Sequence, residues 1–277
     1  MVLENNFSVE SFDPEVLREY DIRGIVGNNL NNNTAYTIGR TFGQIVKKKL
    51  NSNKIVTGYD GRLTSPALHE ALCYGLKDSG ADVFDVGMGP TPMIYFADFH
   101  LNSDAAIMVT GSHNPSEYNG FKMVLNKHSF FSDEIKNLQT LINQNEITSN
   151  QGSIHKKTIV QKYISRILHN ININKHIKVA WDTGNGAMGS VINQITSQLI
   201  NTENIIINAE VDGNFPNHHP DPTVPKNMEQ LINTVLENKC DIGLAFDGDG
   251  DRLGVIDNKG NIVWADQYML ILCSEIS

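Results

Sequence analysis

Three aspartates alternate with glycines in the segment 247–252, which reads Asp-Gly-Asp-Gly-Asp-Arg. It follows an apolar run at 241–246 that predicts a buried strand. Side chains at i, i+2 and i+4 share one face of an extended chain, and glycine lets the backbone curl so that they converge. Carboxylates held about 4 Å apart repel by roughly 4 kcal/mol per pair at an effective dielectric constant near 20. We therefore expect Asp247, Asp249 and Asp251 to bind a hard cation, Mg²⁺ or Ca²⁺.

An EF-hand also begins with alternating acids, but it needs glycine at the sixth loop position and a bidentate glutamate at the twelfth. Those positions hold Arg252 and Asn258, which excludes an EF-hand. Arg252 instead places a fixed positive charge beside the acids, as expected where a multiply charged anion such as phosphate is also held. A solvated acidic turn without an ion is the simpler alternative for this segment alone.

A second candidate segment places a serine on a tight turn. An apolar run at 105–109 predicts a buried strand, and Thr-Gly-Ser-His-Asn-Pro follows at 110–115, where open α/β sheets place their chemistry. A serine-hydrolase elbow would need glycine at the positions of Thr110 and Asn114. A serine beside a Mg²⁺ site suggests a hydroxyl that carries phosphate, because phosphoserine oxygens can share the metal. For Ser112 alone, the alternative is a turn serine that satisfies its own backbone.

Residues 184–189 form a competing motif. They read Gly-Asn-Gly-Ala-Met-Gly after a predicted strand, and Glu210 lies about 20 residues further on, as in a dinucleotide-binding turn. An NAD-dependent oxidoreductase is therefore an alternative function. Asp182 argues against it, because its charge would face the pyrophosphate. The other interpretation is a tight strand-to-helix turn that needs glycine.

Composition limits the class of protein. With 277 residues, 40% of them hydrophobic and 19% charged, the chain suits a soluble globular protein of two domains. A net charge of −9 argues against a general nucleic-acid binder. No apolar stretch approaches about 18 residues, so we expect no membrane span and no signal peptide. Three scattered cysteines fit a reducing compartment, and we expect a cytoplasmic protein.

Predicted strands and helices alternate, which indicates parallel sheets covered by helices. We expect strands at 54–59, 81–86, 105–109, 177–181, 205–207 and 241–246, and helices at 34–50, 65–76, 159–168, 187–199 and 227–237. Asn33 is the expected cap of the first helix, and the polar stretch 144–153 is a predicted linker. The expected fold is α/β, with two consecutive modules of mixed, mainly parallel sheet and the start of a third. The predicted domains are 1–150, 151–262 and 263–277.

Several segments resemble, in the same order along the chain, the motifs of the α-D-phosphohexomutase family. The phosphomannomutase/phosphoglucomutase branch is the most similar. Residues 109–122 resemble its phosphoserine loop, and the acidic segment resembles its metal-binding loop. Further similar segments are Phe12 with 18–24, 58–62 and 212–222.

The resemblance implies Mg²⁺ and reversible transfer of phosphate between O1 and O6 of a hexose, through a phosphoserine and a hexose 1,6-bisphosphate. It implies that Ser112 carries the phosphate and contributes a metal-ligand oxygen. The implied metal ligands are thus Ser112, Asp247, Asp249 and Asp251. The other implied catalytic residues are Lys122, His113 and Arg23, and the implied substrate- or phosphate-binding residues are Arg252, Tyr20 and Asn114. Which of Lys122, Arg23 and His113 handles the hydroxyl proton stays open.

The family normally has four domains, and the resemblance covers its first half. The sequence contains neither the Gly-Glu-x-Ser-Gly-His-type sugar loop nor the Ser-Asn-Thr-type phosphate loop of the later domains. Residues 266–272 resemble the first helix of the third domain, which would expose Met269, Leu270 and Leu272. We expect a truncated or split-gene product that binds metal and accepts phosphate, with weak or absent mutase turnover.

The expected partners are mannose or glucose 1- and 6-phosphate, hexose 1,6-bisphosphate and a complementary C-terminal chain. Neither nucleic acid nor a membrane is an expected partner. The alternative function is a non-catalytic fragment that binds Mg²⁺ and phosphate.

Overall fold

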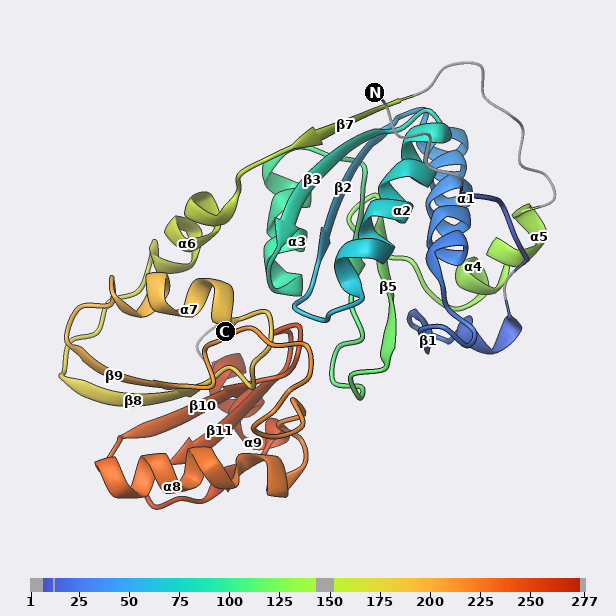
Figure 1. Cartoon of the computed structure of the whole chain (residues 1–277). Coiled ribbons are helices and arrows are strands. Elements are labelled where there is room, and N and C mark those ends of the chain that lie inside the picture. The colour runs from blue at the N-terminus through green and yellow to red at the C-terminus, as the bar shows by residue number, and fades with distance from the viewer. Residues whose placement is uncertain (1–6, 12, 143–151, 275–277) are drawn as a thin grey trace. The chain divides into compact units, whose positions relative to one another are not determined.

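The computed structural model describes residues 7–11, 13–142 and 152–274. Phe12 and most of the predicted linker lie outside these residues, as does the predicted domain boundary at residue 150. The chain divides into two compact units, one of Met1–Gly111 with Ser116–Ile159 and one of Ser112–Pro115 with Val160–Ser277. Each is an α/β unit with its own sheet (Figure 1).

The first unit is built on a seven-stranded sheet of order β1-β5-β4-β2-β3-β7, with β6 paired to β5. Its strands are β1 (Ile22–Ile25), β2 (Lys54–Tyr59), β3 (Asp82–Met88), β4 (Ala105–Val109), β5 (Tyr118–Leu125), β6 (His128–Ser129) and β7 (Ser153–Lys156). Its helices are η1 (Pro14–Val16), α1 (Asn32–Leu50), α2 (Ser65–Asp78), α3 (Thr91–His100), α4 (Asp133–Lys136) and α5 (Leu138–Ile142). β7 pairs in parallel with β3, which is why this unit extends to Ile159.

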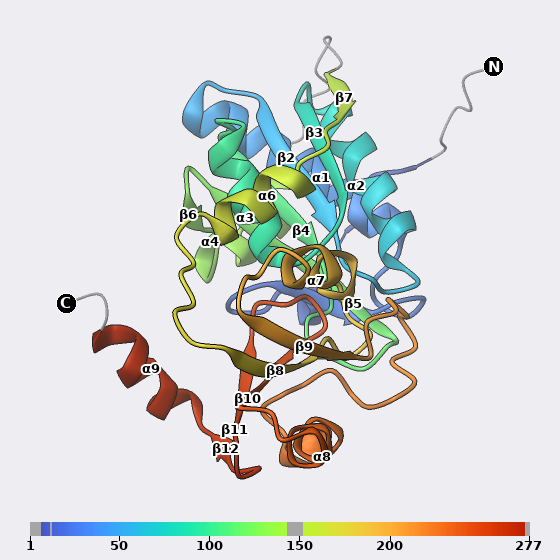
Figure 2. The same cartoon turned by 90° about the vertical axis from the view of Figure 1, so that its left-hand side faces the viewer.

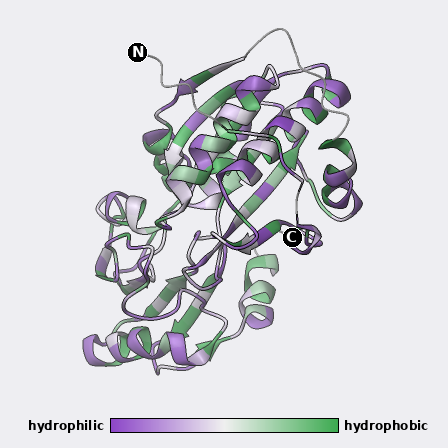
Figure 3. Ribbon diagram, turned by 45° about the vertical axis from the view of Figure 1, so that its right-hand side comes forward, coloured by the Kyte–Doolittle hydropathy of each residue, from purple (hydrophilic) through white to green (hydrophobic). Residues whose placement is uncertain are grey.

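The position of β4 inside the sheet explains why its sequence is a continuous apolar run. It lies between β2 and β5, and all five of its residues are buried. A strand covered on both faces needs no polar alternation. Figure 3 shows hydrophobic residues along the strands, while hydrophilic and hydrophobic residues alternate along the helices. The predicted bounds of β2 and β4 are confirmed.

The cap of α1 differs from the prediction. Asn31, not Asn33, accepts hydrogen bonds at its Oδ1 from the backbone N–H groups of Asn33 (2.7 Å) and Thr34 (3.0 Å). The Thr34 hydroxyl in turn accepts from the Asn31 N–H, which completes a capping box. The helix therefore begins at Asn32, and the prediction that Asn33 caps it is wrong.

The second unit has a five-stranded sheet of order β12-β11-β10-β8-β9. Its strands are β8 (Ile177–Asp182), β9 (Thr202–Ile207), β10 (Ile242–Phe246), β11 (Leu253–Asp257) and β12 (Ile262–Val263). Its helices are α6 (Val160–Leu168), α7 (Gly189–Thr196), η2 (Pro225–Met228), α8 (Glu229–Asn238) and α9 (Ala265–Ser274). Apolar side chains of α6 and α7 form one core cluster, and those of α8 form another.

The predicted fold class is confirmed as two sheets covered by helices, although the sheets are more mixed than expected. Among the described residues, antiparallel strand pairs are as numerous as parallel ones in each sheet. Helix α9 extends away from the sheet of its unit (Figure 2), and Met269, Leu270 and Leu272 are exposed on it, as expected. No helix within the described ranges combines the length and apolar character needed to cross a membrane.

Candidate active site

The acidic loop begins where strand β10 ends. Asp247 and Asp249 are buried and Asp251 is exposed, and one ligand oxygen of each lies within 4.8 Å of the others. The loop is closed by Asp247 Oδ1, which accepts the backbone N–H groups of Asp251 and Arg252, both at 3.0 Å. The predicted convergence of the three carboxylates is therefore present, and their oxygens suit a hard divalent cation.

The charges in this loop work against one another. Burial, and then the charges of Asp249 and Asp251, raise the pKa of Asp247 well above its ordinary value. Three ionised carboxylates this close are costly unless a cation neutralises them. A divalent cation bound by the three carboxylates would remove this repulsion.

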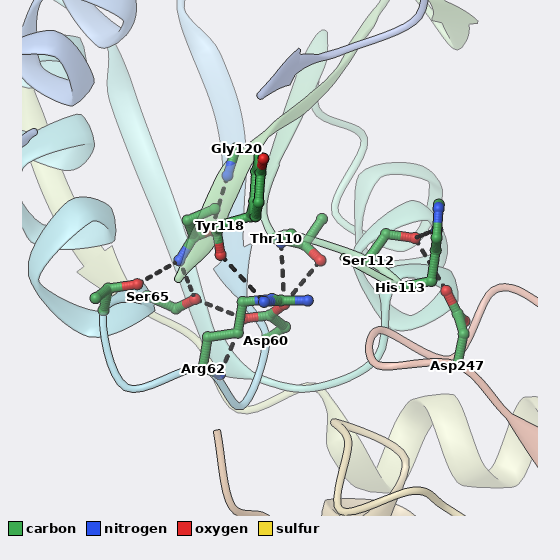
Figure 4. A network of polar contacts seen from close by, with 12 residues as sticks. Asp60, Arg62, Ser65, Thr110, Ser112, His113, Tyr118, Gly120 and Asp247 are labelled. Atoms are coloured by element: carbon green, nitrogen blue, oxygen red, sulfur yellow. Dashed lines mark hydrogen bonds and ion pairs between the residues drawn. The ribbon is translucent and has the colours of Figure 1, made fainter. Parts of the chain in front are cut away.

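Ser112 lies against the acidic loop. It belongs to the second compact unit together with His113, Asn114 and Pro115. Its Oγ donates to Asp247 Oδ2 at 2.9 Å and lies 3.3 Å from His113 Nδ1 (Figure 4). The side chain is buried, and its backbone adopts a φ of 50°, in the left-handed region that few non-glycine residues occupy. The structure therefore brings together the two segments that the sequence singled out.

Asp221 is a site residue to which sequence analysis gave no role. Its Oδ1 lies 4.0 Å from Arg252 Nη1. Burial would raise the pKa of Asp221, but hydrogen bonds from Thr223 and the charges of His113 and Arg252 outweigh burial and lower it. Asp221 thus stays ionised beside the guanidinium of Arg252. The available signal was its place in the segment 212–222, which resembles a family motif.

The remaining predicted residues belong to the first unit. Arg23 is buried and forms an ion pair with Asp21, and Tyr20 is exposed. Lys122 lies on β5, opposite Met108 of β4. Their roles, like those of Ser112, His113 and Asn114 in the reaction, stay predictions.

The glycine turn 184–189 supports the acidic loop. A Cβ at Gly186 would lie 2.7 Å from the carbonyl oxygen of Gly248, so only glycine permits this approach. The backbone N–H groups of the turn already donate within the protein: Gly184 to Asp182 Oδ1, Asn185 to Asn208 O, Gly186 to Thr183 O and Ala187 to Gly248 O. Because these donors are used, the geometry favours a structural turn over the pyrophosphate site that an NAD enzyme would need.

His218 closes the neighbouring loop onto β8. Its Nε2 lies 2.9 Å from Asp182 Oδ2, and its Nδ1 lies 3.0 Å from the His219 carbonyl oxygen. Only the protonated imidazole can donate to both acceptors. Burial by itself would lower the pKa of His218, but the hydrogen bond and charge of Asp182 outweigh burial and raise it.

This pair predicts a pH-dependent stability of the second unit. A raised folded-state pKa contributes stability below the unfolded value of about 6.5, and that contribution is lost as pH rises through the folded value. His218→Gln is therefore expected to destabilise the unit by about 1.5 kcal/mol at pH 5.5 and by less at pH 8.5. Urea unfolding at both pH values measures this, with His219→Gln as the control. An equal loss at both values would contradict a charged His218.

Comparisons with known proteins agree with this geometry. Residues 14–148 match the family model described as phosphoglucomutase/phosphomannomutase, alpha/beta/alpha domain I, and residues 161–260 match that of domain II. A phosphomannomutase/phosphoglucomutase of Pseudomonas putida is 45% identical over 261 residues, which are 94% of this chain and 56% of that protein. A phosphoglucomutase of Neisseria gonorrhoeae is 40% identical over 96% of this chain and 58% of that protein.

A solved structure shares the fold. The phosphoglucomutase/phosphomannomutase family protein of Burkholderia thailandensis superimposes with a TM-score of 0.90 at 38% identity, over 96% of this chain and 59% of that one. The chain spans little more than half the length of the relatives it matches. With both family models matched in order, the chain belongs to the phosphoglucomutase/phosphomannomutase family.

Proposed function

We propose that this chain carries the phosphoryl-transfer centre of a phosphohexomutase, which interconverts hexose 1-phosphate and hexose 6-phosphate. The observation that supports it most is the 2.9 Å hydrogen bond from Ser112 Oγ to Asp247 Oδ2. It places a hydroxyl on a cluster of carboxylates that can hold a cation, which is the arrangement a serine-borne phosphate requires.

The proposed cofactor is Mg²⁺, held by Asp247, Asp249, Asp251 and an oxygen of phosphorylated Ser112. When bound, it neutralises charge on the phosphate oxygens. Arg252 adds a guanidinium from which phosphate oxygens can accept hydrogen bonds, and Asp221 Oδ1 lies 4.0 Å from its Nη1. Mg²⁺ and Arg252 thus supply the positive charge beside the serine phosphate, and without them the acidic groups would repel it.

A carrier serine is needed because a hexose cannot pass its own phosphate from O1 to O6 in line. In the first step, the bond from phosphorus to Ser112 Oγ breaks and a bond from phosphorus to the free sugar oxygen forms, giving a hexose 1,6-bisphosphate; the sugar hydroxyl loses its proton and the serine oxygen gains one. In the second step, Ser112 Oγ loses that proton and bonds to the phosphorus of the other phosphate, while the bond from this phosphorus to the sugar oxygen breaks and the sugar oxygen gains a proton. His113 Nδ1, 3.3 Å from Oγ, is placed to give and take the serine proton.

Labelling of the wild-type chain tests the proposal. We expect ³²P from labelled glucose 1,6-bisphosphate to become covalently attached in the presence of Mg²⁺, at the peptide that contains Ser112, and EDTA to prevent it. Absence of label, or label on another peptide, would contradict the proposed function. Turnover is measured separately in coupled assays with mannose 1-phosphate and glucose 1-phosphate, using the chain alone and with the C-terminal half of the Pseudomonas putida relative. We expect turnover to be weak or absent in the chain alone.

A further inference from the structure

The turn that carries Ser112 is under conformational constraint. It connects β4, which ends at Val109, to β5, which begins at Tyr118. Ser112 adopts a φ of 50°, which costs an L residue of order 1 kcal/mol and persists only where the surroundings hold it. Besides the bond from Ser112 itself to Asp247, contacts act on the segments at the two ends of the turn, which we call its arms: Thr110 and Gly111 before Ser112, and 118–120 after it.

Asp60 holds the first arm. It follows strand β2 and is buried. Its Oδ2 accepts the Thr110 hydroxyl at 2.8 Å and the Gly111 N–H at 3.3 Å. Its Oδ1 accepts the Arg62 N–H at 3.1 Å and the Ser65 hydroxyl at 2.5 Å. Both carboxylate oxygens are thus occupied by donors, and the first arm is tied to the end of β2.

Arg62 holds the second arm. Its side chain is fully buried, its Nε lies 3.3 Å from Asp60 Oδ2, and its Nη1 donates to the Tyr118 carbonyl oxygen at 3.1 Å (Figure 4). A Cβ at Gly111 would lie 2.5 Å from Arg62 Cζ, so glycine is what lets the guanidinium lie against the first arm. One side chain therefore contacts both arms.

Asn119 adds a second link on the same side. Its Nδ2 donates to the Ser65 hydroxyl and to the Thr64 hydroxyl, both at 2.9 Å. Its Oδ1 accepts the Gly120 N–H at 2.9 Å. Ser65 thus joins Asn119 to Asp60, and the second arm is held through two routes.

A buried ion pair is weak support for a purely stabilising role, because its desolvation offsets its attraction. Apolar residues of similar volume would stabilise a core at least as well. Asp60 and Arg62 instead direct their bonds to backbone and hydroxyl groups on the arms of one turn. The arrangement of these bonds therefore fixes the position of the turn.

We propose that the buried Asp60–Arg62 pair is a positioning pair that holds both arms of the Ser112 turn, and so keeps the serine in the conformation that exchanges phosphate. This inference rests on the proposed function for its effect on rate. The effect of the pair on the conformation of the turn does not depend on activity. The positioning role and the proposed function can therefore be tested separately.

The test uses the full chain and two matched pairs of variants. In Asp60→Asn, the amide NH₂ group faces a hydrogen-bond donor whichever way the amide is oriented, so two of the bonds to Asp60 are lost. The control is Asp98→Asn. Asp98 is another buried aspartate of the first unit, hydrogen-bonded to Ser103 and Lys127. Thr110→Val removes the hydroxyl that donates a hydrogen bond to Asp60. Its control is Thr57→Val, a buried threonine on β2 whose hydroxyl contacts His69, and Thr110→Ser should restore the wild-type behaviour.

Two readouts are taken at a temperature at which every variant is folded. Hydrogen exchange of peptides covering 110–119 should be faster by about tenfold in Thr110→Val and about a hundredfold in Asp60→Asn, and unchanged in both controls. The labelling rate at saturating bisphosphate should fall by about tenfold and a hundredfold respectively. The half-saturating bisphosphate concentration should stay the same, because the pair is proposed to act on the position of Ser112.

If exchange at 110–119 is unchanged in Asp60→Asn and Thr110→Val, the inference is overturned. It is also overturned if the control variants slow labelling as much as the test variants do, because the effect would then be one of general stability. A wild-type chain that takes up no label at all would contradict the proposed function. The hydrogen-exchange data would still decide whether the Asp60–Arg62 pair holds the turn.

Discussion

Ser112→Ala is expected to reduce the transfer of ³²P from labelled hexose bisphosphate to the background level, a loss of at least about a thousandfold. The reason is chemical rather than structural. The substitution removes the oxygen that forms the bond to phosphorus, and with it one hydrogen bond to Asp247. The rest of the acidic loop, including the bonds from the Asp251 and Arg252 N–H groups, is untouched. In the unphosphorylated protein, where the three aspartates are the proposed metal ligands, metal binding and the thermal unfolding curve should therefore remain close to those of the wild type.

The matched control for this variant is Ser116→Ala. Ser116 lies on the same turn but is exposed, four residues further along the chain. It should label at the wild-type rate. If Ser112→Ala labels as fully as the control, Ser112 is not the phosphate carrier. If both variants lose label, the turn as a whole is the sensitive element, and the assignment to one hydroxyl would fail.

The acidic loop could be predicted from local sequence because its chemistry is local. Alternation of acids with glycine after an apolar strand is enough to make Asp247, Asp249 and Asp251 converge, and they do. The meeting of Ser112 with Asp247 is different, because 135 positions separate them in the chain. No periodicity reports such a contact, so only the family resemblance could suggest it.

The Asp60–Arg62 pair shows what sequence patterns leave out. Arginine is normally read as a surface residue, since burying its charge is costly without a partner. Here Asp60, two positions away, supplies one partner, and a tertiary contact supplies the Tyr118 carbonyl oxygen as the other. Sequence analysis noted the segment 58–62 only as a motif without a role. The decisive partner groups lie about 50 residues away along the chain.

Some elements were missed for related reasons. Strand β5 was not predicted, because Gly120 and Lys122 interrupt its apolar pattern. It forms nonetheless between β1 and β4, where pairing on both sides satisfies its backbone. Helix α7 was predicted over 187–199 but spans Gly189–Thr196. The predicted first residue, Ala187, belongs instead to the turn that packs on Gly248, and this contact accounts for the later start of the helix.

The second large effect concerns the cation. Without Mg²⁺, Asp249→Asn is expected to stabilise the second unit, because it removes one of the charges that raise the pKa of Asp247. With Mg²⁺ at about a hundred times the wild-type dissociation constant, the wild type should instead be more stable than the variant. The wild type gains about 2.7 kcal/mol from binding, and the variant, having lost a ligand, gains much less. Calorimetric titration should show that its Mg²⁺ affinity is lower by at least about a hundredfold.

The pH dependence follows from the same charges. The raised folded-state pKa of Asp247 contributes stability at low pH, and this is lost as pH rises from about 4 through the folded value. Metal-free wild type should therefore become less stable over that range, and Mg²⁺ should remove the decline. Glu237→Gln, which neutralises an exposed acid on α8, controls for net charge and should leave both effects in place. Thermal unfolding in EDTA and in MgCl₂ at several pH values measures them. If Asp249→Asn and Glu237→Gln behave alike in both solutions, the three aspartates are a solvated acidic turn that binds no cation. A shared cation site, by contrast, makes Asp249→Asn stabilising without Mg²⁺ and destabilising with it.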